Sequence, residues 1–233
     1  MVTMFSRLSK KIPELQRLCP LCRYGNSNEL GLCSVCFNDL PRCPPVNLRL
    51  HMVQPPKGIR LVLAALWYMA EVRYWMLEFK FRGRSAEAKA MATLIAAQAL
   101  QLYRQQQLKL PHYLMPVPMT NIAWAARGYN QAQLLAEALS QALGIPVLHG
   151  AQRIKQTKKA HKLSAKGRKE VLDESFVCIG KLPRGTRIAL IDDVLTTGAT
   201  LGAIASILPR AGIIVDAWTL AYTPPPMLNE TRN

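Results

Sequence analysis

Residues 187–201 read RIALIDDVLTTGATL, and this stretch decides the fold. Its apolar run at 188–191 predicts a buried strand, and the spaced apolar residues within 201–208 predict one face of a helix. Two adjacent aspartates and a turn rich in threonine and glycine join the two. Ligands of open α/β sheets bind beyond the carboxyl ends of the strands. The stretch therefore predicts both a fold class and a site.

The rest of the chain repeats this alternation of strand and helix patterns. Apolar residues recur at helical spacing within 75–79, 91–102 and 132–143. Short apolar runs predict strands at 61–68, 113–117, 145–148, 175–179, 187–191 and 213–222. Such alternation is typical of a mostly parallel sheet with helices on both faces. We therefore expect an α/β fold.

Composition limits the number of domains and the kinds of partner. With 233 residues, half of them hydrophobic, the chain can bury one α/β core and a small additional module. A proline-rich segment at 42–58 predicts a linker, so we expect a module with its linker over 1–56 and the main domain over 57–233. Lys and Arg outnumber Asp and Glu by 30 to 14. The resulting net charge of +16 favours a polyanion, a phosphate ligand or an anionic membrane as partner.

Hydropathy argues against a membrane-spanning chain. The longest apolar run, at 61–70, is too short to cross a bilayer before Glu71 and Arg73 interrupt it. Residues 1–15 include basic residues but no apolar core of a signal peptide. We therefore expect a cytoplasmic protein that is not itself transmembrane.

Four cysteines form two C-x-x-C pairs, Cys19 with Cys22 and Cys33 with Cys36, with ten residues between the pairs. Four thiolates at this spacing suit a tetrahedral Zn²⁺ ion, which would supply the folding energy of so short a segment. Two disulfides or a redox dithiol are the alternatives. Disulfides are disfavoured in a chain with no export signal, and a redox motif needs one pair rather than two. The spacing therefore predicts a structural zinc module within residues 1–56.

The turn after the predicted strand at 187–191 combines several groups that bind phosphate. Gly198 lets backbone N–H groups converge, threonine hydroxyls add donors, and the helix N-terminus adds a positive dipole end. The carboxylates of Asp192 and Asp193 suit the 2′ and 3′ hydroxyls of a ribose. The alternative is a plain strand-to-helix connection with one capping residue, which leaves most of these polar residues unexplained. The stretch therefore predicts a ribose 5-phosphate site.

The same stretch resembles the phosphoribosyl pyrophosphate (PRPP) motif of type I phosphoribosyltransferases. FKFRGR at 79–84, PVP at 116–118, RGYNQA at 127–132 and LSAKGR at 163–168 resemble motifs of the ComF competence-protein family, in that family's order. With the cysteine pairs, the resemblance covers nearly the whole chain. It implies a type I phosphoribosyltransferase-like domain behind a zinc module. It also implies a DNA-uptake factor of natural transformation, which handles incoming single-stranded DNA in the cytoplasm, with the DNA-uptake machinery at the inner membrane as partner.

The resemblance also implies which residues bind PRPP. The acidic pair would hold the ribose and act in any catalysis, and the turn after it would hold the 5-phosphate. The turn after the strand at 113–117 would hold the pyrophosphate, with an arginine as a fixed cation. Mg²⁺ would bridge pyrophosphate and ribose oxygens. The implied PRPP-binding residues are Asp192, Asp193, Thr196, Thr197, Gly198, Ala199, Thr200, Val117, Pro118 and Arg127.

A basic segment, residues 153–169, carries eight Lys or Arg and no acid. Its position resembles that of the loop that closes over PRPP in the transferases. Its cations could instead track the phosphates of single-stranded DNA or form a solvated basic face. Trp124 and Tyr129, beside Arg127, are the aromatic residues that we expect to contact bases. The candidate DNA-binding residues are Lys155, Lys158, Lys159, Lys162, Lys166 and Arg168.

The chain also departs from the family pattern. NIAWAA at 121–126 stands where family members commonly carry more arginines, and His161 and Val171 stand where Gln and Asn are expected. These departures surround the pyrophosphate and lid regions, so PRPP binding is better supported than turnover. No stretch forms an obvious base pocket. The alternative functions are a metabolic phosphoribosyltransferase that releases pyrophosphate from PRPP with an unknown acceptor, and a PRPP sensor without turnover.

Overall fold

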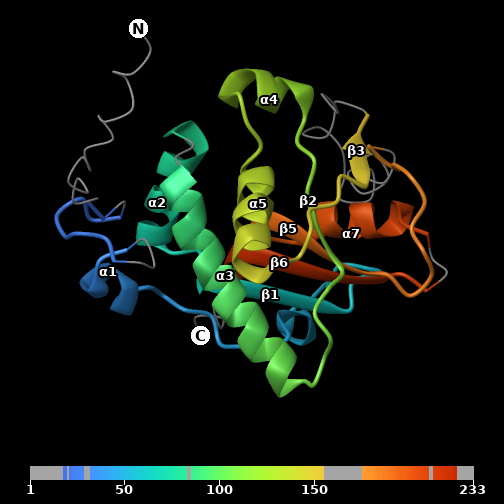
Figure 1. The fold of residues 1–233 in the computed structure, drawn as a ribbon, viewed down its shortest axis with the longest axis horizontal. Helices are drawn as coiled ribbons and strands as arrows, with labels where there is room; N and C mark the ends of the chain where they lie inside the picture. The colour runs from blue at the N-terminus through green and yellow to red at the C-terminus, as the bar shows by residue number, and fades with distance from the viewer. Residues whose placement is uncertain are drawn as a thin grey trace, which may run out of the picture.

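A four-stranded parallel sheet forms the centre of the molecule in a computed structural model, which describes residues 18–19, 21–28, 32–82, 85–154, 175–209 and 212–224 (Figure 1). The strand order is β1-β6-β5-β2, and all three pairings are parallel. Parallel neighbours need crossover connections rather than hairpins, and helices lie in these crossovers. The strands are β1 (Leu61–Trp67), β2 (Tyr113–Pro116), β5 (Arg187–Leu195) and β6 (Ile214–Tyr222).

Helices cover both faces of this sheet, and in Figure 1 α3 and α5 lie in front of the strands. Leu61 and Leu63 of β1 share one buried cluster with α2, α3 and α5, whereas Val62 and Ala64 share the other with α7 and η1. A strand that is buried on both faces reads as a continuous apolar run. Within the described ranges, every helix is too short or too polar to cross a membrane. The helices are α1 (Ser34–Asn38), the 3₁₀ helix η1 (Leu48–His51), α2 (Ala70–Arg82), α3 (Ser85–Gln105), α4 (Asn121–Arg127), α5 (Gln131–Leu143) and α7 (Ala199–Ile207).

The predicted α/β class, with a mostly parallel sheet flanked by helices, is confirmed, although two predicted strands differ. Residues 145–148 contribute a single bridge, between Leu114 and Val147, rather than a strand. The run at 175–179 does contain β4 (Phe176–Cys178), but β4 pairs antiparallel with β3 (Ala151–Arg153) in a separate two-stranded sheet. Val177 of β4 is exposed. Strands of the central sheet are covered on both faces, whereas β4 lies outside that sheet and leaves a side chain open to solvent.

A buried ion pair lies at the amino end of the sheet. Asp216, near the start of β6, is fully buried. Arg60 donates to it twice, from Nε to Oδ1 at 3.0 Å and from Nη2 to Oδ2 at 2.6 Å. The Tyr103 hydroxyl of α3 donates to Asp216 Oδ2 at 2.5 Å, and Trp218 Nε1 donates to the Tyr103 oxygen at 3.2 Å. The buried carboxylate is therefore fully provided with partners, as buried charges require.

The N-terminal cysteine segment packs against the main core. Cys19 and Cys33 are buried in the same apolar cluster as Trp75 and Met76 of α2. The proline-rich linker that follows is also part of the packing, because the ring of Pro56 lies against the turn that begins α7. The linker therefore connects the cysteine segment to the carboxyl end of the sheet.

Candidate functional site

The carboxylate pair lies in the second half of β5. The sequence predicts Asp192 and Asp193 just after the strand, whereas β5 continues through both to Leu195. The reason is that its parallel pairing with β6 extends there, with Asp192 opposite Thr219. Both aspartates are half-buried. The pair still lies toward the carboxyl end of the sheet, where ligands of open α/β folds bind.

A lysine side chain lies beside these two carboxylates and forms an ion pair with one of them. Lys80, near the end of α2, places Nζ 3.0 Å from Asp193 Oδ2, and Asp193 N–H donates to Asp192 Oδ1 at 2.9 Å. Burial, and next the charge of Asp193, raises the pKa of Asp192 to about 8. When both carboxylates are ionised, their charge therefore exceeds that of the one cation among the described ion pairs at this site, and a ligand's cation or hydroxyl donors can offset the excess. Lys80 carries no predicted role, although it lies within the FKFRGR motif, and that motif is the signal that points to it.

The turn after β5 has the features of a phosphate cradle. Gly198 caps α7 with a φ of 70°, a left-handed conformation that favours glycine. A Cβ at this position would lie 3.1 Å from Pro56 Cγ, so glycine also permits the close approach of the linker. Ala199 N–H donates to Thr197 Oγ1 at 3.3 Å. Thr196 and Thr197 are exposed, so their hydroxyls are accessible to an anion beside the N-terminus of α7.

Three of the predicted motifs meet at this edge of the sheet. Val117 N–H donates to Ile191 O at 2.9 Å, which holds the turn after β2 beside β5. Asn130 donates from Nδ2 to Val117 O at 2.9 Å, and its Oδ1 caps the start of α5. The Tyr129 hydroxyl donates to Phe79 O at 2.5 Å. RGYNQA thus joins the PVP turn to FKFRGR, whose lysine reaches the carboxylates.

The structure describes two more of the predicted site residues, Arg127 and Pro118, whereas several others lie outside the described ranges. Arg127 ends α4, a helix that is not predicted from the sequence, and its Nη1 donates to Gln131 Oε1 at 3.3 Å. Pro118 is half-buried in the turn after β2. Several predicted features lie outside the described residues: Lys155, Lys158, Lys159, Lys162, Lys166 and Arg168, the LSAKGR motif, His161 and Val171.

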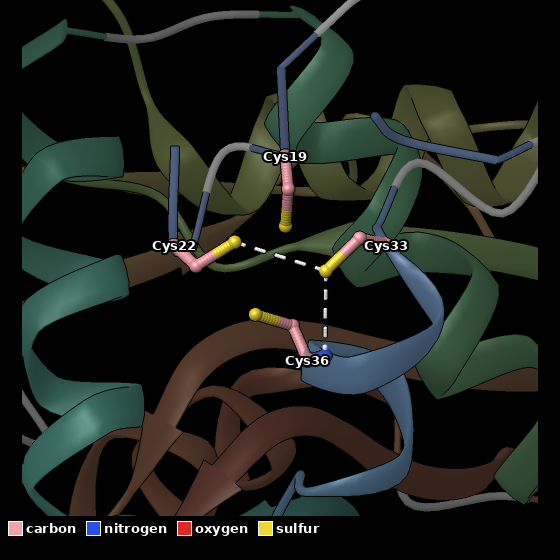
Figure 2. A group of neighbouring side chains, drawn as sticks. All are labelled: Cys19, Cys22, Cys33 and Cys36. Carbon is pink, nitrogen blue, oxygen red and sulfur yellow. Dashed lines mark hydrogen bonds between the residues drawn. The ribbon is translucent and has the colours of Figure 1, made fainter. Parts of the chain in front are cut away.

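The four predicted metal ligands point toward one centre (Figure 2). The sulfur atoms of Cys19, Cys22, Cys33 and Cys36, here called the cysteine knuckle, all lie within 4.8 Å of one another. Cys22 Sγ is 3.7 Å from Cys33 Sγ. Zn–S bonds of about 2.3 Å at tetrahedral angles place sulfurs about 3.8 Å apart. The knuckle can therefore hold one tetrahedral metal ion such as zinc, and all six cysteines are free thiols.

Local backbone geometry favours the thiolate form of Cys22 in the cysteine knuckle, whereas burial raises the pKa of Cys36. Hydrogen bonds from the backbone of Gly25, and next of Tyr24, lower the pKa of Cys22 to about 6, which favours its ionised form. Cys36 N–H donates to Cys33 Sγ at 3.4 Å. A Cβ at Gly25 would lie 2.8 Å from Cys33 Cβ, so only glycine allows this approach. The backbone between the two cysteine pairs thus approaches the sulfur atoms closely.

Helix α2 connects the cysteine knuckle with the carboxylates. Arg23, between Cys22 and the second pair, forms an ion pair with Glu78. Two residues further along the same helix, Lys80 pairs with Asp193. Both sites therefore depend on the position of one helix.

Comparisons with known proteins identify the family. The chain is 33% identical to Competence protein F of Haemophilus influenzae over 222 residues, which cover 87% of this chain and 96% of that protein. It is 33% identical to the DNA utilization protein YhgH of Escherichia coli K12 over 223 residues, which cover 88% of this chain and 97% of that one. Competence protein ComFC of Bacillus subtilis is 33% identical over 135 residues, 58% of this chain and 52% of that one. No protein-family model matches the chain.

The solved structures that resemble this chain include adenine phosphoribosyltransferases. One is 17% identical, has a TM-score of 0.39 and covers 64% of this chain and 75% of that one. The enzyme from Saccharomyces cerevisiae is 15% identical, with a TM-score of 0.37. These likenesses are distant, whereas the match to the competence proteins is close in sequence and nearly complete in length. Because a third of the aligned residues are shared over almost all of Competence protein F, the chain belongs to the ComF competence-protein family.

Proposed function

We propose that this chain is a DNA-uptake factor of natural transformation, which handles incoming single-stranded DNA in the cytoplasm and carries a PRPP-binding site. Its relatives are named for competence and for DNA utilization, which supports the first part. One observation carries the second part. Lys80 pairs with Asp193, next to Asp192, toward the carboxyl end of a parallel sheet and beside a threonine-rich turn.

The residues at that edge suit each part of PRPP. The carboxylates of Asp192 and Asp193 accept hydrogen bonds from the ribose hydroxyls, and the proton of Asp192 is released to solvent as the ligand binds. The backbone N–H groups and hydroxyls of residues 196–200 hold the 5-phosphate. The turn at 117–118 approaches the pyrophosphate, and Arg127 offers a cation to its oxygens. Mg²⁺, carried in with PRPP, would supply further positive charge for the phosphate oxygens.

The remaining parts of the chain suit the handling of DNA. A net charge of +16 supports contacts with DNA phosphates, which we assign to the basic residues within 155–168. Residues 1–56 form a zinc module and linker in this proposal, and the phosphoribosyltransferase-like domain spans 57–233. Zinc held by the cysteine knuckle contributes folding energy to the module. The partner is the DNA-uptake machinery at the inner membrane.

Calorimetric titration with PRPP and Mg²⁺ tests the binding site. We expect the wild-type chain to bind PRPP, and the Asp192→Ala/Asp193→Ala double variant to lose binding while its melting temperature is kept. Asp39→Ala removes an exposed carboxylate elsewhere and is the matched control. Equal affinity of the wild type and the double variant would exclude the ribose assignment.

Two further assays separate this proposal from its alternatives. A metabolic phosphoribosyltransferase predicts base-dependent release of pyrophosphate from PRPP, whereas the proposed factor needs PRPP binding only. A labelled oligonucleotide tests the DNA part, because affinity should fall steeply with added salt as each phosphate contact releases counterions. Affinity that does not respond to salt would contradict the role assigned to the net charge.

Elemental analysis tests the metal. Cys19→Ser or Cys36→Ser should lose bound zinc and destabilise the N-terminal segment, because three sulfurs cannot complete the tetrahedron. Cys43→Ser changes a buried cysteine outside the cysteine knuckle and should keep the zinc content of the wild type. Full zinc content in both knuckle variants would refute the metal assignment.

A further inference from the structure

We propose that a pocket between α4 and α5 binds one unstacked base of single-stranded DNA, an inference that rests on the DNA-binding part of the proposed function. The pocket has a volume of about 410 Å³, within the range of ligand sites in proteins. No base pocket is predicted from the sequence, because the lining residues come from the turn after β2, from α4 and from α5. They include Pro118, Trp124, Tyr129, Asn130, Gln133 and Glu137.

Trp124 offers the surface on which a base can stack. Its side chain is 58% exposed, and Ile122 on the same short helix is 56% exposed, whereas Trp75 and Trp218 are fully buried. Exposed aromatic rings near cations are a recurrent means of holding single strands, because every base has a π-face. Arg127 supplies such a cation at the end of α4.

Two other lining residues are held in place by hydrogen bonds. The Tyr129 hydroxyl is tied to Phe79 O at 2.5 Å, and the Asn130 amide is tied to Val117 O at 2.9 Å. Side chains that are ordered before binding need not lose rotamer freedom when the ligand arrives. This part of the pocket is therefore preformed.

The polar side chains of the pocket favour bases that carry an amino group. Gln133 Nε2 donates to Glu137 Oε1 at 2.6 Å, which holds a carboxylate at the pocket. A carboxylate accepts hydrogen bonds from the exocyclic amino groups of cytosine, adenine and guanine, and thymine has no such group. Cytosine and adenine are therefore preferred over thymine.

The exposure of Trp124 identifies the source of the base. Sites for free small molecules bury most of the ligand's surface, whereas an open ring on a surface helix can cover only one face of a base. Stacking on one face of a base is a weak contact by itself. It therefore suits a base in a strand whose phosphates are also bound by the protein. Pro118 lines this pocket and belongs to the turn proposed for pyrophosphate, so phosphate-binding groups lie close by.

Binding of labelled oligo(dC), oligo(dA) and oligo(dT) of about 20 nucleotides to the full chain, at one salt concentration, tests the pocket. Trp124→Ala should weaken oligo(dC) binding about 5- to 140-fold, which is the effect of losing one stacked base. Trp124→Phe keeps an aromatic face and should retain most of the affinity. Tyr74→Ala removes a similarly exposed aromatic residue from α2 and should leave binding unchanged. Glu137→Gln should narrow the preference for oligo(dC) over oligo(dT).

The outcomes separate this inference from the proposed function. Salt-dependent binding of oligo(dC) that is equal in the wild type and Trp124→Ala would overturn the pocket and leave the DNA function standing. Absence of oligonucleotide binding by the wild type would overturn both, and the PRPP titration would then report on the phosphoribosyl site alone. If free deoxycytidine quenches Trp124 fluorescence as effectively as oligo(dC), the occupant is a nucleoside and the strand-bound assignment is wrong.

Discussion

The two ends of the central sheet both carry aspartates, but the carboxylates at the two ends differ in the number of partners that offset their negative charge. At the amino end, Asp216 is fully buried and receives two hydrogen bonds from Arg60 and one from a tyrosine hydroxyl. Toward the carboxyl end, Asp192 and Asp193 share only Lys80 among the described ion pairs, and burial raises the pKa of Asp192. Both ends belong to the same strands, so the difference lies in the partners that each carboxylate has.

This difference distinguishes a carboxylate that stabilises the fold from the pair that we propose to bind a ligand. A buried charge with a complete set of partners has little remaining capacity to form hydrogen bonds or ion pairs with an incoming molecule. A pair of acids with one cation is stabilised further when donors or a metal ion arrive. We therefore expect changes at the amino end to reduce stability, and changes at the carboxyl end to reduce binding.

Asp216→Ala should produce the largest change in stability. It leaves the Arg60 guanidinium without its carboxylate, so the free energy of unfolding should fall by about 3 kcal/mol, at the lower end for a broken buried pair because 33% of the Arg60 side chain is exposed. Urea unfolding followed by tryptophan fluorescence measures the loss. The Asp192→Ala/Asp193→Ala variant is the comparison and should unfold at the wild-type urea concentration or above it. A similar loss in both variants would remove the contrast between the two ends.

Gly198→Ala tests whether the turn near the carboxyl end also supports the fold. Alanine at a φ of 70° costs about 1 kcal/mol, and contact with Pro56 should raise the total to about 2 kcal/mol. Gly144→Ala is the matched control, because its φ is 69° but nothing lies within 4 Å of the added Cβ. Thermal unfolding should rank the two variants in that order, and only Gly198→Ala should weaken PRPP binding. Equal losses in both would argue against tight packing of the linker on the turn.

The pH dependence of stability tests the shifted carboxyl group directly. Between about pH 4 and about pH 8 the folded chain keeps a proton on Asp192 that the unfolded chain has released. The free energy of unfolding should therefore fall as the pH rises through this window. Urea titrations across the window should show a flatter profile for Asp192→Asn than for the wild type. Parallel profiles for the wild type and Asp192→Asn would mean that this carboxyl group titrates normally.

Lys80→Met should have the smallest effect on stability and a clear effect on binding. The ion pair with Asp193 is partly exposed, so its loss should change the free energy of unfolding by less than about 1 kcal/mol. The positive charge of Lys80 lowers the pKa of Asp192, so its removal should raise that pKa. PRPP affinity, measured by calorimetry against pH, should then rise at a higher pH than in the wild type. A variant with the wild-type pH profile would contradict the coupling of Lys80 to the pair.

The sequence predicts well those structural elements that depend on residues close together in the chain. The apolar runs at 61–68 and 213–222 match β1 and β6 closely, and the spacing of the C-x-x-C pairs anticipates the clustered sulfurs. Two aspartates in a row look like the end of a strand, whereas β5 passes through them because β6 offers pairing beyond that point. Local pattern therefore identifies an element more reliably than its end.

Interactions between distant segments leave no such local signal. Arg60 and Asp216 are 156 residues apart, and the aspartate lies inside an apolar run that reads as an ordinary strand. Lys80 lies in a motif that marks it as a candidate, but only the fold brings it to Asp193. The same holds for the pocket beside Trp124, which three segments build together.

The contact between Pro56 and Gly198 has a consequence for how the chain can be divided. A shortened chain that begins at residue 57, where composition suggests a boundary, would lack the proline ring that packs on the turn before α7. Its turn would be hydrated where the full chain is packed, although no residue of the turn itself had changed. An exchange of N-terminal modules between proteins should therefore preserve the turn only if Pro56 is kept with the module.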